Sequence, residues 1–428
     1  MSFILPLLCP GPLPAAGPLS GPAASALAEM AADVPAPPAP AAASVPREWT
    51  VMVYVNGKNN LETFALDDVN EMERVGSSDS VNVVAELGRM NGYSNEEGDW
   101  KGVRRYYITK DTASYEIGSP VVQDLGKRDM GDWRELAGFT RWAKANYPAK
   151  RYMLIVWNHG SGWRIPEPPA AGRGISYDDE THNHITTPQL SLALREAGGV
   201  DVYASDACLM QMVEVAYEIK DSAAYIVGSE ETEPAAGYPY DTLLRPLAAS
   251  PGMGPEELSR LTVDAYSDYY KRKKAASTCS ALKASAVEGL RGRVDEFAQA
   301  MMLVGDKDIF HSARKVALSY AFESNIDLYD LAELVGSMTR DPVVAGKAAA
   351  LRAYISGELV LYNRYNLPQE SGDDNPPWKS GARDGARGYD KSHGIAIYAP
   401  EGEYNADYDA LAWAMASRWK KFIGWYNR

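Results

Sequence analysis

Two short motifs contain residues that could act together as a nucleophile and its base. One is Trp157-Asn158-His159-Gly160-Ser161-Gly162-Trp163, and the other is Ser205-Asp206-Ala207-Cys208-Leu209-Met210. Imidazole titrates near neutral pH, and a thiol must lose its proton before it becomes a strong nucleophile. His159 and Cys208 are therefore a candidate base and a candidate nucleophile.

Each motif follows an apolar stretch that is typical of a buried strand, residues 152–156 before the histidine and residues 201–204 before the cysteine. The carboxyl ends of parallel strands lie at one edge of a sheet, where ligands bind in open α/β folds. If the two strands are parallel neighbours, His159 and Cys208 meet at that edge.

Strand-like and helix-like stretches alternate along much of the chain. The strands are predicted near residues 49–55, 81–87, 104–108, 152–157, 201–204, 223–229 and 278–282. Helices of about 10 to 15 residues between strands are typical of a mostly parallel sheet with helices on both faces. From about residue 287 to 365 the pattern is mainly helical, and a late strand (393–398) and a final helix (408–425) follow. The predicted division is a leader at 1–46, a catalytic domain at 47–290 and a mainly helical C-terminal region at 291–428.

At these two motifs the chain resembles the clostripain family of cysteine peptidases, in the caspase-like clan. The 49 residues from His159 to Cys208 suit that clan, and the stretches 54–62, 176–179 and 228–234 support the resemblance. The resemblance implies a caspase-like three-layer α/β sandwich with an additional helical C-terminal region. It also implies a cysteine endopeptidase that acts on peptides or proteins through a thioacyl intermediate.

The resemblance also assigns roles to three residues. His159 would be the general base and acid, and Cys208 would attack the scissile carbonyl. The backbone amides of Gly160 and Cys208 would form the oxyanion hole, where negative charge develops. Glycine suits that position because a close approach of substrate leaves no room for a side chain.

Asp206 precedes the nucleophile by two residues, so in an extended strand the two side chains share a face. A neighbouring negative charge raises a thiol pKa, which argues against a catalytic role for Asp206. As the floor of a substrate pocket it would pair with Arg or Lys of the substrate, and the family has its basic-residue specificity at this position. The alternative is an aspartate that caps the next helix. Among Glu230, Glu231 and Glu233 we expect Glu230 to supply a second acid.

Arg164 and Arg173 lie in the long polar loop between the two motifs. Relatives are often activated by cleavage after a basic residue in this loop. An enzyme that cuts after Arg could therefore process itself here, with Arg173, between two glycines, as the more accessible position. The alternative is that both are solvated loop arginines.

The same loop contains His182 and His184, two histidines without a nearby cysteine, which is a weak zinc pattern. Asp178, Asp179 and Glu180 could hold calcium through oxygen ligands, and calcium dependence occurs in the family. We expect no required cofactor and assign no metal ligand. A metal-dependent hydrolase and a catalytically silent, peptidase-like binding protein remain as alternatives.

Composition narrows the class of protein and its surroundings. A net charge of −14 over 428 residues argues against non-specific nucleic-acid binding. After the leader no stretch approaches the roughly 20 apolar residues of a membrane helix, so we expect no membrane-spanning segment in a mature, monomeric chain. The leader is apolar at its start and contains Ala26-Leu27-Ala28, which resembles an export cleavage site. We therefore expect export; the alternative is a misassigned start followed by a linker.

Overall fold

A strand that is buried on both faces forms the centre of the fold. The computed structural model describes residues 46–113, 115–163, 174–367, 388–402 and 404–428, and in it strand β1 (Arg47–Gly57) is buried from Trp49 onward. Val51, Val53 and Val55 belong to one hydrophobic core, whereas Met52 and Tyr54 belong to another. Because alternate side chains of a strand point to opposite faces, both faces of this sheet must be covered.

Nine strands form one sheet in the order β12-β10-β9-β8-β5-β1-β2-β3-β4. The five central strands, from β9 to β2, are parallel, and the strands at both edges are antiparallel. The remaining bounds are β2 (Val81–Arg89), β3 (Gly102–Tyr107), β4 (Val121–Gly126), β5 (Ala149–Trp157), β8 (Val200–Asp206), β9 (Ala223–Gly228), β10 (Ser277–Lys283) and β12 (Val360–Asn366).

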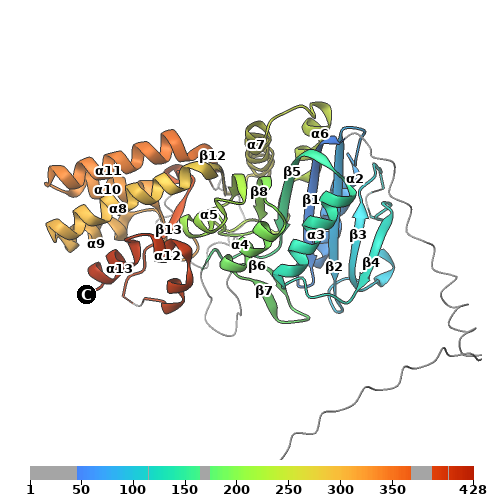
Figure 1. Ribbon diagram of the computed structural model, residues 1–428, viewed down its shortest axis with the longest axis horizontal. Coiled ribbons are helices and arrows are strands. Elements are labelled where there is room, and N and C mark those ends of the chain that lie inside the picture. The colour runs from blue at the N-terminus through green and yellow to red at the C-terminus, as the bar shows by residue number, and fades with distance from the viewer. Residues whose placement is uncertain (1–45, 114, 164–173, 368–387, 403) are drawn as a thin grey trace, which may run out of the picture. The chain divides into compact units, whose positions relative to one another are not determined.

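Helices cover the two faces in separate layers (Figure 1). The face of Met52 packs against α3 (Trp133–Asn146), α4 (Thr187–Glu196) and α5 (Val213–Ile219), and the opposite face packs against α2 (Glu62–Glu73), α6 (Tyr240–Ala249) and α7 (Pro255–Lys273). Two of these helices begin at side-chain caps: Asp132 caps α3, and Thr186 and Gln189 form a capping box before α4. The predicted three-layer α/β sandwich is therefore confirmed.

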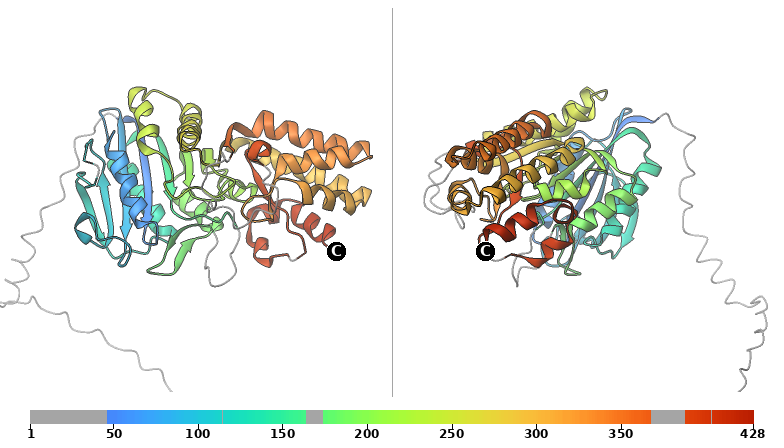
Figure 2. Two further views of the ribbon diagram at one scale, coloured as in Figure 1. Left: turned by 180° about the vertical axis from the view of Figure 1, so that it is seen from behind. Right: turned by 60° about the vertical axis from the view of Figure 1, so that its left-hand side comes forward.

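The C-terminal region contains most of the remaining helices. They are α8 (Val287–Val304), α9 (Lys307–Val316), α10 (Leu328–Met338), α11 (Pro342–Tyr354), α12 (Ala412–Ala416) and α13 (Trp419–Tyr426). Helices α8, α10 and α11 lie side by side in both views of Figure 2. The region is largely helical, as predicted, and no helix in the described ranges is long and apolar enough to cross a membrane.

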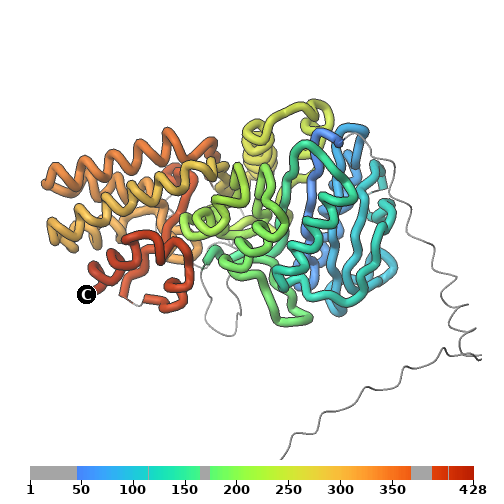
Figure 3. The backbone as a smooth tube through the Cα atoms, viewed as in Figure 1, coloured from blue at the N-terminus to red at the C-terminus, as the bar shows by residue number. Residues whose placement is uncertain are grey.

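Helical structure ends earlier than the pattern up to residue 365 indicated. After the π-helical turn Ile355–Leu359 the chain returns to the sheet as β12, which pairs antiparallel with β10. Between these two neighbouring strands the chain forms helices that extend away from the sheet (Figure 3). Two further strands, β11 (Asn325–Asp327) and β13 (Ala396–Tyr398), pair with each other. Strands this short depend on a partner distant in sequence, which local periodicity does not show.

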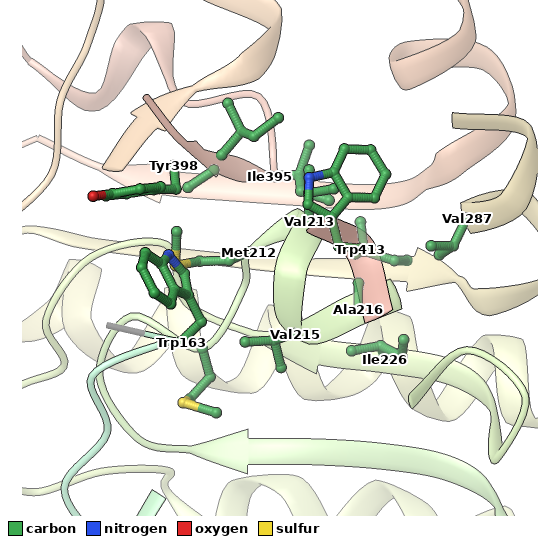
Figure 4. Close-up of a cluster of buried hydrophobic side chains, with 14 of the residues drawn as sticks. Trp163, Met212, Val213, Val215, Ala216, Ile226, Val287, Ile395, Tyr398 and Trp413 are labelled. Carbon is green, nitrogen blue, oxygen red and sulfur yellow. The ribbon is translucent and has the colours of Figure 1, made fainter. Parts of the chain in front are cut away.

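One apolar cluster joins the helix after the cysteine motif to the C-terminal region. In Figure 4, Val213 and Ala216 of α5 lie near Val287, Ile395 and Trp413. On the same core, the ring of Trp163 packs edge-on against Tyr398 with centroids 4.5 Å apart. The two motifs and the C-terminal region therefore share one core. Residues 1–45, nearly all of the predicted leader, lie outside the described residues.

Candidate active site

The two motif strands are parallel neighbours, as the sequence predicted. The second half of β5, from Met153 to Trp157, pairs with β8, and Trp157 is opposite Asp206 at the carboxyl ends. The backbone N–H of Asn158 extends this ladder by donating to the carbonyl of Asp206 at 3.2 Å. The side chain of Asn158 donates to the carbonyl of Asn56 and accepts the N–H of Tyr177 at 2.8 Å. Asn158 therefore fixes the direction in which the chain leaves β5.

His159 is half-buried, and its imidazole contacts the loop that follows β1. Its Nε2 lies 2.8 Å from the side-chain oxygen of Asn60. An amide oxygen only accepts hydrogen bonds, so Nε2 carries the proton and Nδ1 is left as the basic nitrogen. Burial lowers the pKa of His159, and the charge of Asp179 partly opposes this effect. The imidazole is therefore neutral near pH 7, the state that a general base requires.

Gly160 brings the backbone of the histidine motif against the cysteine motif. A Cβ placed on Gly160 would lie 2.4 Å from the carbonyl oxygen of Cys208 and 3.0 Å from Cβ of Ala207. Only glycine allows this approach without displacing the backbone. In the part of the chain that the structure describes, no hydrogen bond to another residue uses the N–H of Gly160 or Cys208. Both amides are thus free to bind an oxyanion.

Cys208 lies at a sharp turn directly after β8. The next residue, Leu209, has a φ of 65°, a left-handed conformation that is rare for a non-glycine residue. The thiol accepts the backbone N–H of Glu233 at 3.2 Å and lies 3.8 Å from the carbonyl of the same residue. Burial, and secondly the charge of Glu233, raises the pKa of Cys208 to about 12. Within the described ranges, no hydrogen bond links His159 to Cys208.

Asp206 is the last residue of β8, two positions before Cys208, and is only 3% exposed. Its carboxylate accepts the N–H of Tyr238 at 3.1 Å and the hydroxyl of Tyr240 at 2.8 Å. It also forms a hydrogen bond with the carboxyl of Glu233. Burial raises the pKa of Asp206 to about 6 despite these hydrogen bonds. Asp206 therefore contacts the segment that follows β9, and it does not cap the helix after the cysteine motif.

Glu230, the expected second acid, has different neighbours from Asp206. Its Oε1 accepts the hydroxyl of Ser392 and the N–H of Gly394, both at 2.8 Å. The hydroxyl of Tyr320 donates to the same oxygen at 3.3 Å. These partners belong to the C-terminal region, so the structure brings Glu233, and not Glu230, to Asp206.

The predicted loop between the motifs contains a short hairpin of β6 (Ile175–Asp178) and β7 (Asn183–Ile185). Nζ of Lys58 pairs with Asp178 and with Glu180, each at 2.8 Å, so a lysine already neutralises two of the three carboxylates considered for calcium. His184 stacks on the ring of Tyr177 at 5.2 Å. No group of three or more metal-ligating side chains occurs among the residues searched, which are those described above. Arg164 and Arg173 lie outside the described residues.

Two contacts at the site escaped sequence reasoning. Asn60 lies in the family-like stretch 54–62, but its spacing from His159 does not indicate a contact. Glu233 is one of three acids within four residues, and no local pattern distinguishes them. Both contacts depend on loops that meet only because β1, β5, β8 and β9 are arranged in one sheet.

Comparison with known proteins gives the family. The profile of the clostripain family matches residues 53–425. Clostripain from Hathewaya histolytica is 33% identical over 230 residues, which are 49% of this chain and 44% of clostripain. The chain thus spans less than half the length of that relative.

Two solved structures share the fold. One is a secreted C11 cysteine protease from Bacteroides thetaiotaomicron in complex with an irreversible peptide inhibitor, with a TM-score of 0.64 and 21% identity over 87% of this chain and 99% of the other. The second is an inactive zymogen C11 protease from Parabacteroides distasonis, with a TM-score of 0.64 and 20% identity over 87% and 98% of the two chains. At this identity the similarity concerns the fold alone. Together with the profile match over most of the chain, it agrees with the resemblance seen in the two motifs, and the chain belongs to the clostripain family of peptidases.

Proposed function

We propose that this protein is a cysteine endopeptidase that cleaves after Arg or Lys. One observation carries the proposal: the motifs of His159 and Cys208 lie at the ends of adjacent parallel strands, with the buried acid Asp206 at the end of the cysteine strand. Membership of the clostripain family supports the reaction class.

The geometry suits a thioacyl mechanism. Nδ1 of His159 takes the proton of the Cys208 thiol as sulfur forms a bond to the scissile carbonyl carbon. The oxyanion accepts the N–H groups of Gly160 and Cys208. When the C–N bond breaks, the imidazolium gives its proton to the leaving amine and a thioester remains. Water, deprotonated by the same imidazole, then hydrolyses the thioester and restores the thiol.

Specificity for Arg or Lys is proposed from the charge and burial of Asp206. Asp206 is a buried carboxylate, and no Lys or Arg of the described chain forms an ion pair with it. A buried charge without a counter-ion is costly. A guanidinium or ammonium group of the substrate would supply that counter-ion, whereas an acidic substrate side chain would be repelled.

The first test is hydrolysis of fluorogenic peptides ending in Arg, Lys, Asp or Leu under reducing conditions, with and without calcium. We expect turnover after Arg or Lys that is lost in Cys208→Ala. Cys279→Ala is the matched control, because Cys279 is buried in β10 and has no role in the mechanism; it should keep wild-type turnover. Turnover only after Asp would contradict the role of Asp206. No turnover on any peptide would favour the silent binding protein, and loss on chelation of metals would favour the metal-dependent hydrolase.

We further propose that the protein is made as a latent precursor and cuts itself at Arg173 or Arg164. Support comes from the resting contacts, in which the thiol is bonded to Glu233 and the imidazole to Asn60. The solved relative that is an inactive zymogen is consistent with latency. Intact mass measured over time should show cleavage in wild type, none in Cys208→Ala, and none in the Arg164→Ala/Arg173→Ala double variant. Cleavage that persists in the double variant would contradict these positions.

Export is proposed on the leader-like composition of residues 1–46 and on the relative that is secreted. Sequencing the N-terminus of protein recovered from the medium and from cells would test it. A protein retained in the cell with an intact leader would overturn it.

A further inference from the structure

The segment after β9 places a second acid against the predicted specificity acid. Glu233 binds the Cys208 thiol through its backbone N–H, and its carboxyl forms a hydrogen bond with that of Asp206. Both carboxyl oxygens of Glu233 are buried, and no N–H or O–H group of the described residues donates to them. Glu233 therefore contacts both the nucleophile Cys208 and the acid Asp206.

Two carboxyl groups in hydrogen-bonding contact cannot both be ionised without a compensating charge. Burial and the charge of Asp206 raise the pKa of Glu233 well above its usual value. In the resting state Glu233 is thus the protonated partner that donates to the Asp206 carboxylate. The proton on Glu233 removes one of the two negative charges, so the buried pair with Asp206 needs no cation in the resting state.

A third carboxyl adds to the negative character of this buried region. Asp68 accepts the indole N–H of Trp157 at 2.6 Å, and burial followed by the charge of Asp206 raises its pKa well above the usual value. Among the residues that the structure describes, no Lys or Arg forms an ion pair with Asp68, Asp206 or Glu233. Glu230, by contrast, already accepts three hydrogen bonds elsewhere.

Buried tyrosine rings pack together next to these acids. Tyr238 packs edge-on against Tyr266 with centroids 5.5 Å apart, and Tyr266 packs against Tyr270 at 4.7 Å. The hydroxyl of Tyr266 is buried without a partner among the described residues, and burial raises its pKa well above the usual value. Aromatic faces together with carboxylates are the usual surroundings of a bound guanidinium.

We propose that Glu233 is the second acid of the specificity pocket, and that a substrate guanidinium binds by replacing the proton shared between Glu233 and Asp206. This proposal rests on the proposed function of the site. On binding, Glu233 is ionised, the guanidinium lies between two carboxylates, and one proton leaves to solvent. Total charge is conserved, because one proton is released for each cation bound.

The experiment compares wild type with Glu233→Gln, whose amide can still donate to Asp206 but cannot be ionised. We expect the variant to raise KM for peptides ending in Arg by about 10- to 100-fold, the range of a lost charge-assisted hydrogen bond, with kcat changed by less than about threefold. Glu231→Gln is the matched control, since Oε1 of Glu231 accepts the N–H groups of Thr232 and Ala321 and an amide oxygen can do the same; its KM should equal that of wild type. An unchanged or lower KM in Glu233→Gln would overturn the proposal.

A second measurement uses only the wild-type protein and so does not depend on the folding of a variant. Agmatine, a small guanidinium compound, is titrated into wild-type protein by calorimetry at pH 7 in buffers with different heats of ionisation. We expect release of about one proton per agmatine bound, and an affinity that rises up to tenfold per pH unit until the pair is ionised. Binding without proton release would overturn the proposal. Wild type that cleaves no Arg or Lys peptide would instead refute the proposed function.

Discussion

The backbone N–H of Glu233 donates to the sulfur of Cys208 at 3.2 Å, and the carboxyl of the same residue meets Asp206. The nucleophile and the predicted specificity acid are therefore covered by one residue. Exposure of the thiol and opening of the pocket require movement of the same short segment, which couples the two events.

The first prediction concerns the reactivity of the resting thiol. With its pKa raised to about 12, Cys208 should react with iodoacetamide at pH 8 on the order of a thousandfold more slowly than a free thiol, because the thiolate is the reactive form. Peptide mapping by mass spectrometry measures the rate at which Cys208 is labelled, and Cys208→Ala serves as the control without this thiol. After denaturation the peptide containing Cys208 should react at the ordinary rate. Rapid labelling of native, uncut protein would contradict the closed state.

Asn60 should orient the base. Asn60→Ala removes the acceptor for Nε2 of His159, so we expect kcat to fall about 5- to 50-fold with little change in KM. This is less than the roughly 100- to 10,000-fold contribution of a general base, because the base itself remains. Asn60 is exposed, so stability should not change. Asn60→Asp keeps the acceptor and adds a charge that raises the pKa of His159. It should retain most of kcat and move the acidic limb of the pH profile upward. If both variants matched wild type, the hydrogen bond would have no orienting role.

Gly160→Ala should damage both the site and the fold. The added methyl group would lie 2.4 Å from the carbonyl of Cys208, so one backbone segment must shift. We expect kcat/KM to fall at least 100-fold through the displaced oxyanion amide and stability to fall by about 1 to 3 kcal/mol. Gly138→Ala is the control: a Cβ on this glycine of α3 meets no atom within 4 Å, and alanine should stabilise the helix slightly. A fully active Gly160→Ala variant would exclude the proposed oxyanion site.

Asp206 should make stability depend on pH. Its pKa is about 6 in the folded protein against an ordinary value of 3.8, so between these values the folded state binds more protons than the unfolded state. The free energy of unfolding should therefore decrease as pH rises from about 4 to about 6. Asp206→Asn should remove this decrease and stabilise the protein at pH 7 by about 1 to 2 kcal/mol, while abolishing cleavage after Arg. Urea unfolding at several pH values measures how the free energy of unfolding depends on pH in wild type and in Asp206→Asn. If the variant kept the wild-type pH dependence, another group would be responsible for it.

Sequence alone was sufficient for the strands that carry the two motifs. Residues 152–157 and 201–204 are apolar runs bounded by polar residues, and such runs are a local property of the chain. The caps of α3 and α4 are equally local, since Asp132 and Thr186 act on residues two or three positions away. The class of the fold and the pairing of His159 with Cys208 at one sheet edge followed from these local signals and from the family resemblance.

Tertiary structure alone decided which groups surround those two residues. Asn60 reaches His159 across 99 residues of sequence and Glu233 reaches Cys208 across 25, because the loops after β1 and β9 meet the loops after β5 and β8 at one edge. Loop residues have no periodicity, so no local pattern pointed to Glu233 in place of Glu230, the acid that we expected. In the folded chain one accepts hydrogen bonds from the C-terminal region and the other faces Asp206, since loop contacts depend on the positions of distant strands and not on spacing along the chain.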